Sequence, residues 1–282
     1  MRDLKVTSLT DREQEAFDEQ GYVVVSDCLG AAEIDILRTQ LPAVLADDSP
    51  RRVLERDGRT VRAVHGVHAT NDVFSRLVRH PRLIGPAQRI LDDDVYVHQF
   101  KINVKSAFEG DIWKWHQDFI FWLKQDGMRE PRCVNAMLYL NDVTEFNGPL
   151  YVVPGSHREG VVDVNAAGDG RGWQASVSAD LKYAIPQSRL ADMVERKGLD
   201  APKGRAGSVL FTHSNLVHGS PPNMSPFDRT LVIITYNSVK NALDPVPNPR
   251  PEFLISRDFT PLTALGDDAL LGLATSAAMA TS

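Results

Sequence analysis

The sequence has few cysteines and no long apolar segment, and each absence excludes a class of protein. Its two cysteines, Cys28 and Cys133, are far apart and match neither zinc nor redox spacing, so we expect free thiols in a reducing cytoplasm. No run of 18 apolar residues is present, so we expect no transmembrane helix and no membrane partner. The first residues also lack the apolar core of a signal peptide. These absences together favour a cytoplasmic protein.

The chain also lacks an excess of basic charge. Lys and Arg together number 31 and Asp and Glu number 37, which gives a net charge of −6. Nucleic-acid binding calls for a basic face, so we expect no nucleic-acid partner. A hydrophobic content of 43% over 282 residues is typical of a globular protein with a sizeable core. Nothing in the composition indicates an oligomeric state.

The first third of the chain has helical patterns. Thr10 and Glu13 form a capping box and Gly21 is a stop signal, which predicts a helix at 11–20. Apolar residues at helical spacing predict an amphipathic helix at 31–46. The remaining predictions are a strand at 22–25, a loop at 47–60 and short helices at 71–79 and 81–92.

After residue 93 the sequence is rich in β-forming residues. Strands are predicted at 95–105, 133–140, 150–153, 207–212 and 229–236, separated by Gly, Pro, Asn and Asp. Helices followed by many short strands favour an antiparallel sandwich or jelly roll. We expect one domain over 1–282, with a helical part at about 1–92 packing on a β core at about 93–260. The segment 164–206 is expected to form a lid or an insertion.

His116 and Asp118 lie in an aromatic stretch, Trp-Lys-Trp-His-Gln-Asp-Phe-Ile-Phe-Trp, at 113–122. If this stretch is a strand, residues two apart project from the same face. An imidazole and a carboxylate on one face provide two ligands of a facial triad, which leaves open positions on Fe(II). A surface pair beside a structural aromatic cluster is the alternative, because a two-residue pattern is common.

A third ligand is expected from the segment 209–220, where His213 and His218 compete. Ser220 shares a face with His218 if the strand continues. The other histidines are more often structural residues. They are His65, His68, His80, His98 and His157.

Arg229 opens an apolar strand eleven residues after His218. A buried guanidinium needs an anionic partner, and a carboxylate matches its fork. The partner is either a dicarboxylate co-substrate or a nearby acidic side chain such as Asp228 or Asp142.

These residues resemble the phytanoyl-CoA dioxygenase superfamily, in which His-X-Asp, His-Gly-Ser and Arg occur in this order. Longer motifs are similar to bacterial proline trans-4-hydroxylases and cover about residues 12–265. They include Arg59-Thr-Val-Arg-Ala-Val-His-Gly66, Tyr96-Val-His-Gln-Phe-Lys-Ile-Asn103, Asn147-Gly-Pro-Leu150 and Arg250-Pro-Glu-Phe253. Ectoine hydroxylases are also similar, but Gln117 stands where they have Ser, and Ile120-Phe121 where they have Glu-Thr.

The resemblance implies a double-stranded β-helix (a cupin-like jelly roll) that uses Fe(II), 2-oxoglutarate and O₂, with ascorbate as a supporting reductant. It implies hydroxylation of a free small amino acid, L-proline to trans-4-hydroxy-L-proline, with succinate and CO₂ as co-products. Pipecolate, ectoine or a catalytically silent binding module are the alternatives. The implied catalytic metal ligands are His116, Asp118 and His218, and the implied 2-oxoglutarate contacts are Lys101, Asn103, Ser220 and Arg229.

Four residues are candidates for contacting the substrate. Arg62 could clamp a carboxylate, or it could be a surface charge. Gln99 lies two residues before Lys101 on the same strand face and could hydrogen-bond the substrate. Phe121 and Trp122 could form an apolar wall against a pyrrolidine ring, or belong to the core.

Overall fold

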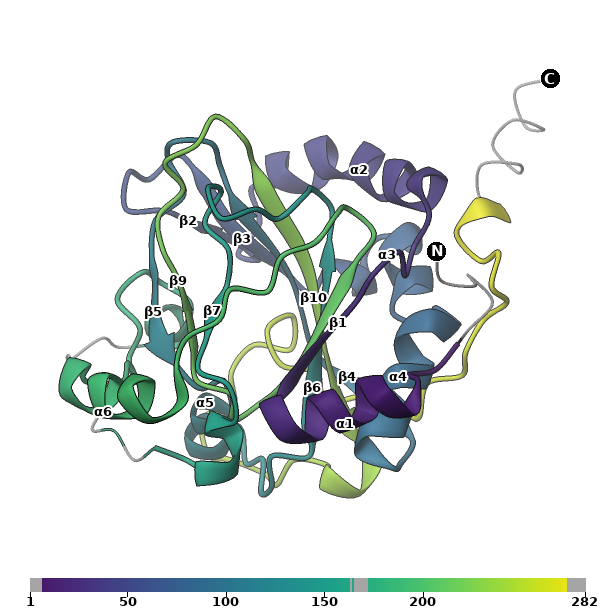
Figure 1. The fold of residues 1–282 in the computed structure, drawn as a ribbon. Helices are drawn as coiled ribbons and strands as arrows, with labels where there is room; N and C mark the ends of the chain where they lie inside the picture. Colours follow the sequence, from purple (N-terminus) through teal and green to yellow (C-terminus); the bar gives the residue numbers. More distant parts are fainter. Residues whose placement is uncertain (1–6, 163, 165–171, 273–282) are drawn as a thin grey trace.

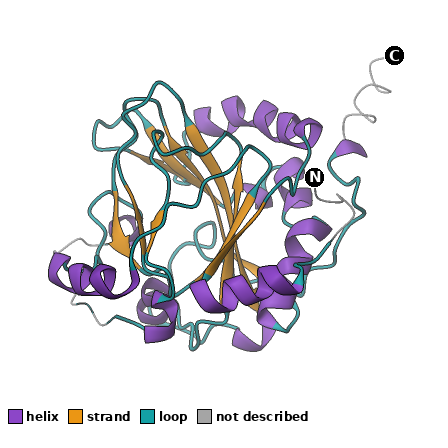
Figure 2. Ribbon diagram, viewed as in Figure 1, coloured by secondary structure: helices purple, strands orange, loops and turns teal. Residues whose placement is uncertain are grey.

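Two antiparallel sheets form the centre of the molecule (Figures 1 and 2). The computed structural model describes residues 7–162, 164 and 172–272. The large sheet has the order β1-β8-β6-β10-β4-β3-β2 and the small sheet the order β5-β9-β7. The strands of the large sheet are β1 (Tyr22–Val25), β2 (Arg52–Leu54), β3 (Val61–His65), β4 (Val95–Lys105), β6 (Cys133–Tyr139), β8 (Val209–His213) and β10 (Arg229–Ser238). Those of the small sheet are β5 (Trp113–His116), β7 (Tyr151–Val152) and β9 (His218–Ser220). The predicted mainly β jelly roll with flanking helices is confirmed.

Helices cover the outer side of the large sheet. In Figure 1, α2, α3 and α4 lie on the side of this sheet away from β5, β7 and β9, whereas α5 and α6 lie beside the small sheet. The helices are α1 (Asp11–Gln20), α2 (Ala31–Ala46), α3 (Asp72–Leu77), α4 (Pro81–Leu91), α5 (Phe119–Gln125) and α6 (Gln187–Lys197). Short 3-10 turns are η1 (Val67–Ala69), η2 (Ser156–Glu159), η3 (Trp173–Ser176) and η4 (Val239–Asn241). None of the described helices is long and apolar enough to cross a membrane.

The two faces of the large sheet have different chemistry. In β4, the even-numbered Phe100, Ile102 and Val104 belong to the apolar core against the helices. The odd-numbered residues of the same strand, Lys101 and Asn103, line a cavity toward the small sheet. Because side chains alternate across a strand, one strand supplies both the core and the polar wall of the interior.

The N-terminal third contributes strands as well as helices. β2 lies inside the predicted loop at 47–60, and β3 was not predicted. Together with β1 they form the outer strands of the large sheet, so the expected boundary near residue 93 does not separate a helical layer from a β layer. β2 is three residues long and has no fully buried side chain, so it has no alternating apolar pattern to reveal it.

The predicted lid at 164–206 lies partly outside the described residues. The part that the structure describes includes η3 and α6, and the amide of Ile185 donates to the carbonyl of Trp115 at 2.7 Å. This segment therefore packs directly beside β5.

Candidate functional site

His116, Asp118 and His218 meet between the two sheets. One ligand atom of each lies within 4.8 Å of the others, and all three residues are buried. His116 Nε2 is 3.6 Å from one carboxylate oxygen of Asp118, and His218 Nε2 is 3.8 Å from the other. These spacings allow all three groups to bind one metal ion.

A strand pairing and a sharp turn bring these three side chains together. β5 pairs with β9 in a register that places His116 opposite His218. The strand ends at His116, and Asp118 has helical dihedral angles (φ −71°, ψ −40°) as the N-cap of α5. The expectation that His116 and Asp118 share one face of a continuous strand was therefore wrong. The chain turns into α5 there, and the turn directs the carboxylate toward the imidazoles.

Hydrogen bonds fix the orientation of each metal-binding side chain. The Nδ1 of His116 lies 2.6 Å from the carbonyl of Lys114, and the Nδ1 of His218 lies 2.9 Å from that of Leu216. These contacts leave both Nε2 atoms for a metal, the usual arrangement for histidine ligands. Asn135 Nδ2 donates to Asp118 Oδ2 at 2.7 Å and orients the carboxylate.

Asp118 is ionised at the centre of this group. Burial alone would raise the pKa of Asp118, but Lys101 and the two imidazoles outweigh burial and hold the pKa well below its usual range. Burial lowers the pKa of His218 to about 4. A carboxylate and neutral imidazoles are the protonation states that a metal requires.

His213 lies away from the metal-binding group. It ends β8, and its ring centroid is 5.0 Å from that of His157. The structure thus places His218, and not His213, beside His116 and Asp118.

One cavity runs from the triad to Arg229, and we name it the Arg229 cavity. Its lining includes all four residues expected to contact 2-oxoglutarate: Lys101, Asn103, Ser220 and Arg229. Arg229 is buried, and among the described residues no acidic side chain forms an ion pair with it. Its Nη2 donates to Ser220 Oγ at 3.2 Å, whereas its Nε has no hydrogen-bond partner in the part of the chain that the structure describes. Both suggested acidic partners are engaged elsewhere, Asp228 with the amide of Ala107 and Asp142 with that of Ala206.

A buried lysine, Lys105, lies beside Arg229. Its Nζ donates to Ser220 Oγ at 2.7 Å and also to the carbonyl of Pro221. Burial, with a contribution from Arg229, lowers the pKa of Lys105 to about 6. Gly148 closes over this lysine with a φ of 71°, and a Cβ there would lie 2.4 Å from the Lys105 side chain. The Asn147-Gly148 motif therefore allows the chain to cover the cationic end of this cavity.

A second cavity runs from the triad to Arg250, and we name it the Arg250 cavity. Its lining includes three of the predicted substrate residues, together with two that were not predicted: Gln99, Phe121 and Trp122, with His65 and Arg250. Arg250 is buried and donates through Nε and Nη2 to the carboxylate of Asp126. Lys101, Trp113, His116 and Asp118 line both cavities, so the triad lies where the two cavities meet.

Arg62 has a different environment from the one expected for a substrate clamp. Its guanidinium is fully buried and donates to Glu55 at 2.8 Å and to the carbonyls of Val177 and Ile112. It also stacks on Trp113, 3.7 Å from the ring centroid. Every nitrogen of its guanidinium is thus used inside the protein, and Arg62 is absent from the lining of both cavities.

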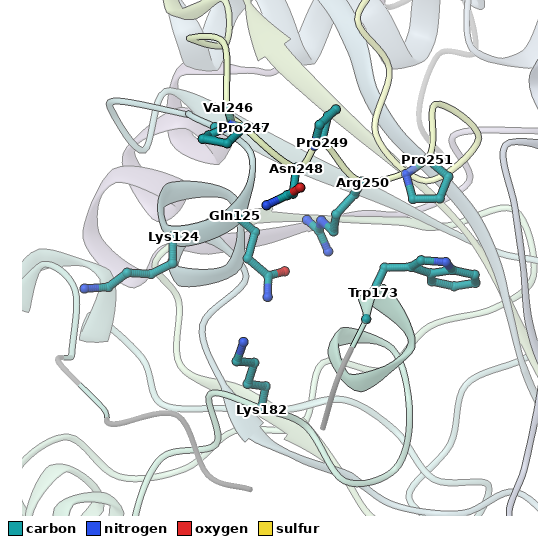
Figure 3. Close-up of a pocket in the computed structure, with 11 residues that line it drawn as sticks. Lys124, Gln125, Trp173, Lys182, Val246, Pro247, Asn248, Pro249, Arg250 and Pro251 are labelled. Carbon is teal, nitrogen blue, oxygen red and sulfur yellow. The ribbon is translucent and has the colours of Figure 1, made fainter. Parts of the chain in front are cut away.

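An open groove adjoins the Arg250 cavity (Figure 3). It has a volume of about 540 Å³, and Arg250 lines both spaces. In Figure 3 Lys182 and Arg250 point toward the middle of the groove. The two cavities at the triad are narrow, about 30 Å³ each.

The donor atoms fit a ferrous ion and a dicarboxylate. Two imidazoles and one carboxylate with open positions form the ligand set of non-haem Fe(II) oxygenases. The unpartnered Arg229 Nε and Asn103 Oδ1 are buried polar atoms that a bound molecule can satisfy. A cation without an acidic partner at the end of the Arg229 cavity matches a distal carboxylate.

Comparison with known proteins agrees with this geometry. The model of the phytanoyl-CoA dioxygenase (PhyH) family matches residues 17–231. The chain belongs to the phytanoyl-CoA dioxygenase family. It is accordingly a dioxygenase. The chain is 39% identical to L-proline trans-4-hydroxylase of Streptomyces griseoviridis over 90% of this chain and 95% of that protein. It is 37% identical to ectoine dioxygenase of Nocardia farcinica over 87% of this chain and 85% of that protein.

Solved structures give the same assignment. The crystal structure of EctD from S. alaskensis with 2-oxoglutarate and 5-hydroxyectoine has a TM-score of 0.79 and 32% identity, with 94% of this chain and 90% of that chain covered. The structure of the same protein with bound Fe has a TM-score of 0.77 and 32% identity, over the same shares. Both are similar to this phytanoyl-CoA dioxygenase family member over nearly its whole length.

Sequence reasoning missed four residues of the site, each of which has a detectable signal. Asn135 is the one polar residue inside the apolar strand β6, and Lys105 ends the long strand β4. Arg250 and His65 lie within two motifs quoted for the resemblance, but Arg250 was given no role and His65 was expected to be structural. An isolated polar residue in a buried strand was the usable signal, since such a residue needs a buried partner.

Proposed function

We propose that this dioxygenase uses Fe(II) and 2-oxoglutarate to hydroxylate a free small amino acid, L-proline, giving trans-4-hydroxy-L-proline. The observation that carries the proposal is the pair of cavities that meet at the triad and end in different cations. The Arg229 cavity ends in a cation that lacks an acidic partner, which suits a dicarboxylate. The Arg250 cavity ends in an arginine already paired with Asp126, which suits a molecule without net charge.

The triad would hold the metal. His116, Asp118 and His218 would supply its three protein ligands, and this ligand set leaves positions for a co-substrate and O₂. With 2-oxoglutarate and O₂, Fe(II) supplies the oxidising chemistry that converts C–H into C–OH while 2-oxoglutarate leaves as succinate and CO₂. Asn135 holds the carboxylate in place, so the protein controls the direction in which the open positions point.

The Arg229 cavity orients the co-substrate. Arg229 Nε and Nη2 form the edge of a fork that matches a carboxylate. Lys105 and Ser220 join it in the same hydrogen-bonded cluster. The apolar Leu231 and Ile233 line the cavity between this end and the metal and exclude water from it.

The Arg250 cavity holds the substrate. Asp126 occupies the Nε and Nη2 edge of Arg250, and no described hydrogen bond uses Nη1, so Nη1 can donate to the carboxylate of an amino acid. We assign this role to Arg250 in place of Arg62. Phe121 and Trp122 give the apolar wall that a pyrrolidine ring requires. Lys124 and Lys182 add positive charge to the adjoining groove and favour the approach of a carboxylate.

Phe121 supports proline over ectoine. It stands where the ectoine hydroxylase pattern has threonine, and it lines the Arg250 cavity. A larger apolar side chain at that wall narrows the space and removes a hydroxyl group, which suits a small hydrocarbon ring.

The test compares substrates on one preparation of the enzyme. Protein supplied with Fe(II), ascorbate and 2-oxoglutarate is given L-proline, ectoine or L-pipecolate, and succinate and the hydroxylated product are measured by NMR. We expect L-proline to give the largest stimulation of succinate release, together with trans-4-hydroxy-L-proline. Stimulation by ectoine alone would overturn the substrate assignment, and stimulation by no amino acid would overturn amino-acid hydroxylation. Asp118→Ala is the inactive control.

A further inference from the structure

His65 is a buried histidine whose ring has no hydrogen-bond partner among the described residues. It ends β3, pairs with Lys101 of β4 in the sheet register, and is 1% exposed. Neither Nδ1 nor Nε2 has a hydrogen-bond partner, yet the residue lines the Arg250 cavity. Leaving a buried polar atom unsatisfied costs about 1–3 kcal/mol, so such a side chain calls for an explanation.

We propose, building on the function proposed above, that His65 recognises the amine of the substrate by accepting a hydrogen bond from its N–H. It is then a residue that determines specificity, since it selects molecules that have an N–H beside the carboxylate. A neutral imidazole offers one lone pair for this purpose.

The surroundings keep this imidazole neutral. Burial, followed by the charges of Lys101 and Arg250, lowers the pKa of His65 to about 3. The ring therefore cannot bind the substrate carboxylate as a cation, and it presents a lone pair near neutral pH. Lys101 and Arg250 are themselves donors, so they cannot accept from an ammonium group.

Gln99 offers a second acceptor on the same wall. Its Nε2 donates to the carbonyl of Leu254 at 3.2 Å, which leaves Oε1 as the acceptor atom of the amide. A secondary ammonium group has two N–H bonds, and His65 and Gln99 provide one acceptor for each. Arg250 takes the carboxylate, so the three side chains match the polar groups of a cyclic amino acid.

His98 serves as a matched control. It is also fully buried, and in the described part of the chain neither of its ring nitrogens has a hydrogen-bond partner. Its ring packs edge-on against Trp122, with centroids 5.0 Å apart, and it is absent from the lining of the Arg250 cavity. Burial and lack of partners are thus shared by the two histidines, and only His65 reaches the cavity.

The test uses a substrate that differs at one atom. (S)-Tetrahydrofuran-2-carboxylate has a ring oxygen where L-proline has its NH₂⁺ group, so it cannot donate to His65. We compare kcat/KM for both molecules in the wild type, His65→Phe and His98→Phe, measured as stimulated succinate release. Turnover of 2-oxoglutarate without substrate, and KM for 2-oxoglutarate, report whether the rest of the site is intact.

We expect His65→Phe to lower kcat/KM for L-proline by about 10- to 100-fold and to lower the preference for L-proline over the oxygen analogue by a similar factor. His98→Phe should leave this preference unchanged. If His65→Phe fails to fold, His65→Leu also removes both nitrogens and should give the same loss.

The outcomes separate this inference from the proposed function. Suppose that the wild type hydroxylates L-proline or another amino acid, and that His65→Phe or His65→Leu keeps the wild-type preference for L-proline over the oxygen analogue. The role of His65 is then overturned, while the proposed function stands. If the wild type hydroxylates no amino acid, the proposed function fails and this inference fails with it.

Discussion

The two cavities beside the triad use buried arginines in opposite ways. In the Arg229 cavity no acidic side chain of the described residues pairs with the guanidinium, and Lys105 donates to the same Ser220 hydroxyl as Arg229 does. In the Arg250 cavity the guanidinium is paired with Asp126, and the nearby His65 is neutral. The charge of Arg229 is not neutralised by the described residues and calls for a bound anion, whereas the charge of Arg250 is already neutralised by Asp126. A dianion therefore suits the first cavity and a zwitterion the second.

A third buried arginine shows why burial alone does not identify a binding residue. Arg62 is as buried as Arg229, but Glu55 and two backbone carbonyls occupy its nitrogens. A binding arginine is distinguished by guanidinium nitrogens that no group of the protein engages.

Removal of Arg62 should have the largest effect, and the effect should be on stability. Arg62→Met leaves the buried Glu55 without its cation, which typically costs about 3–5 kcal/mol. Urea unfolding followed by circular dichroism measures this loss. If the variant stayed as stable as the wild type while KM for L-proline rose, Arg62 would be a substrate clamp after all.

Removal of Arg229 should weaken co-substrate binding instead. In Arg229→Ala we expect KM for 2-oxoglutarate to rise about 100-fold, or about 2.7 kcal/mol, because a carboxylate loses its cation. KM for L-proline should change little, and Arg229→Lys, which keeps the charge but not the fork, should fall between. Steady-state succinate assays measure both constants, and an unchanged KM for 2-oxoglutarate would place the anchor elsewhere.

Removal of Asn135 should lower the affinity for Fe(II) although all three metal ligands remain. The Nδ2 atom of Asn135 orients Asp118, so Asn135→Ala should lower the affinity for Fe(II) by about 10- to 100-fold. Thr235→Val removes only the bond from the Thr235 hydroxyl to Asn135 Oδ1 and should have a smaller effect. Anaerobic iron titration by calorimetry distinguishes these variants, and equal affinities in Asn135→Ala and the wild type would contradict the role.

Acidification should also destabilise the protein, in part because two buried histidines stay neutral in the folded state. Burial lowers the pKa of both His65 and His98 from 6.5 to about 3. Below pH 6.5 the unfolded chain takes up protons that the folded chain does not, so stability falls as the pH falls toward 3. Each histidine contributes up to about 1.4 kcal/mol per pH unit. Unfolding free energies of His98→Phe measured from pH 6.5 to 4.5 should have a shallower slope than the wild type, and identical slopes would contradict the assignment.

Local patterns predicted much of the fold because they have local causes. The capping box at Thr10 and Glu13 fixed the start of α1, and Gly21, with a φ of 80°, ends it where expected. The helix at 31–46 was predicted with its observed bounds. β2 and β3 were missed because their partners in the sheet, and not their own sequence, determine that they are strands.

The site was only partly predictable, because residue types are visible in the sequence but contacts between distant residues are not. The identities of His116, Asp118 and His218 follow from residue chemistry and order, whereas the turn that positions Asp118 depends on α5 packing behind it. Whether Arg62 or Arg250 reaches the cavity depends on the distant Glu55 and Asp126, and no local pattern contains that information.

One metal centre joins a dicarboxylate cavity to an amino-acid cavity in this proposal, and an NMR time course of the purified protein with Fe(II), 2-oxoglutarate, O₂ and L-proline tests it most directly. The proposal predicts that trans-4-hydroxy-L-proline and succinate accumulate in a ratio of about one to one, and that neither forms in Asp118→Ala. Succinate release that is indifferent to every amino acid, with no hydroxylated product, would contradict it.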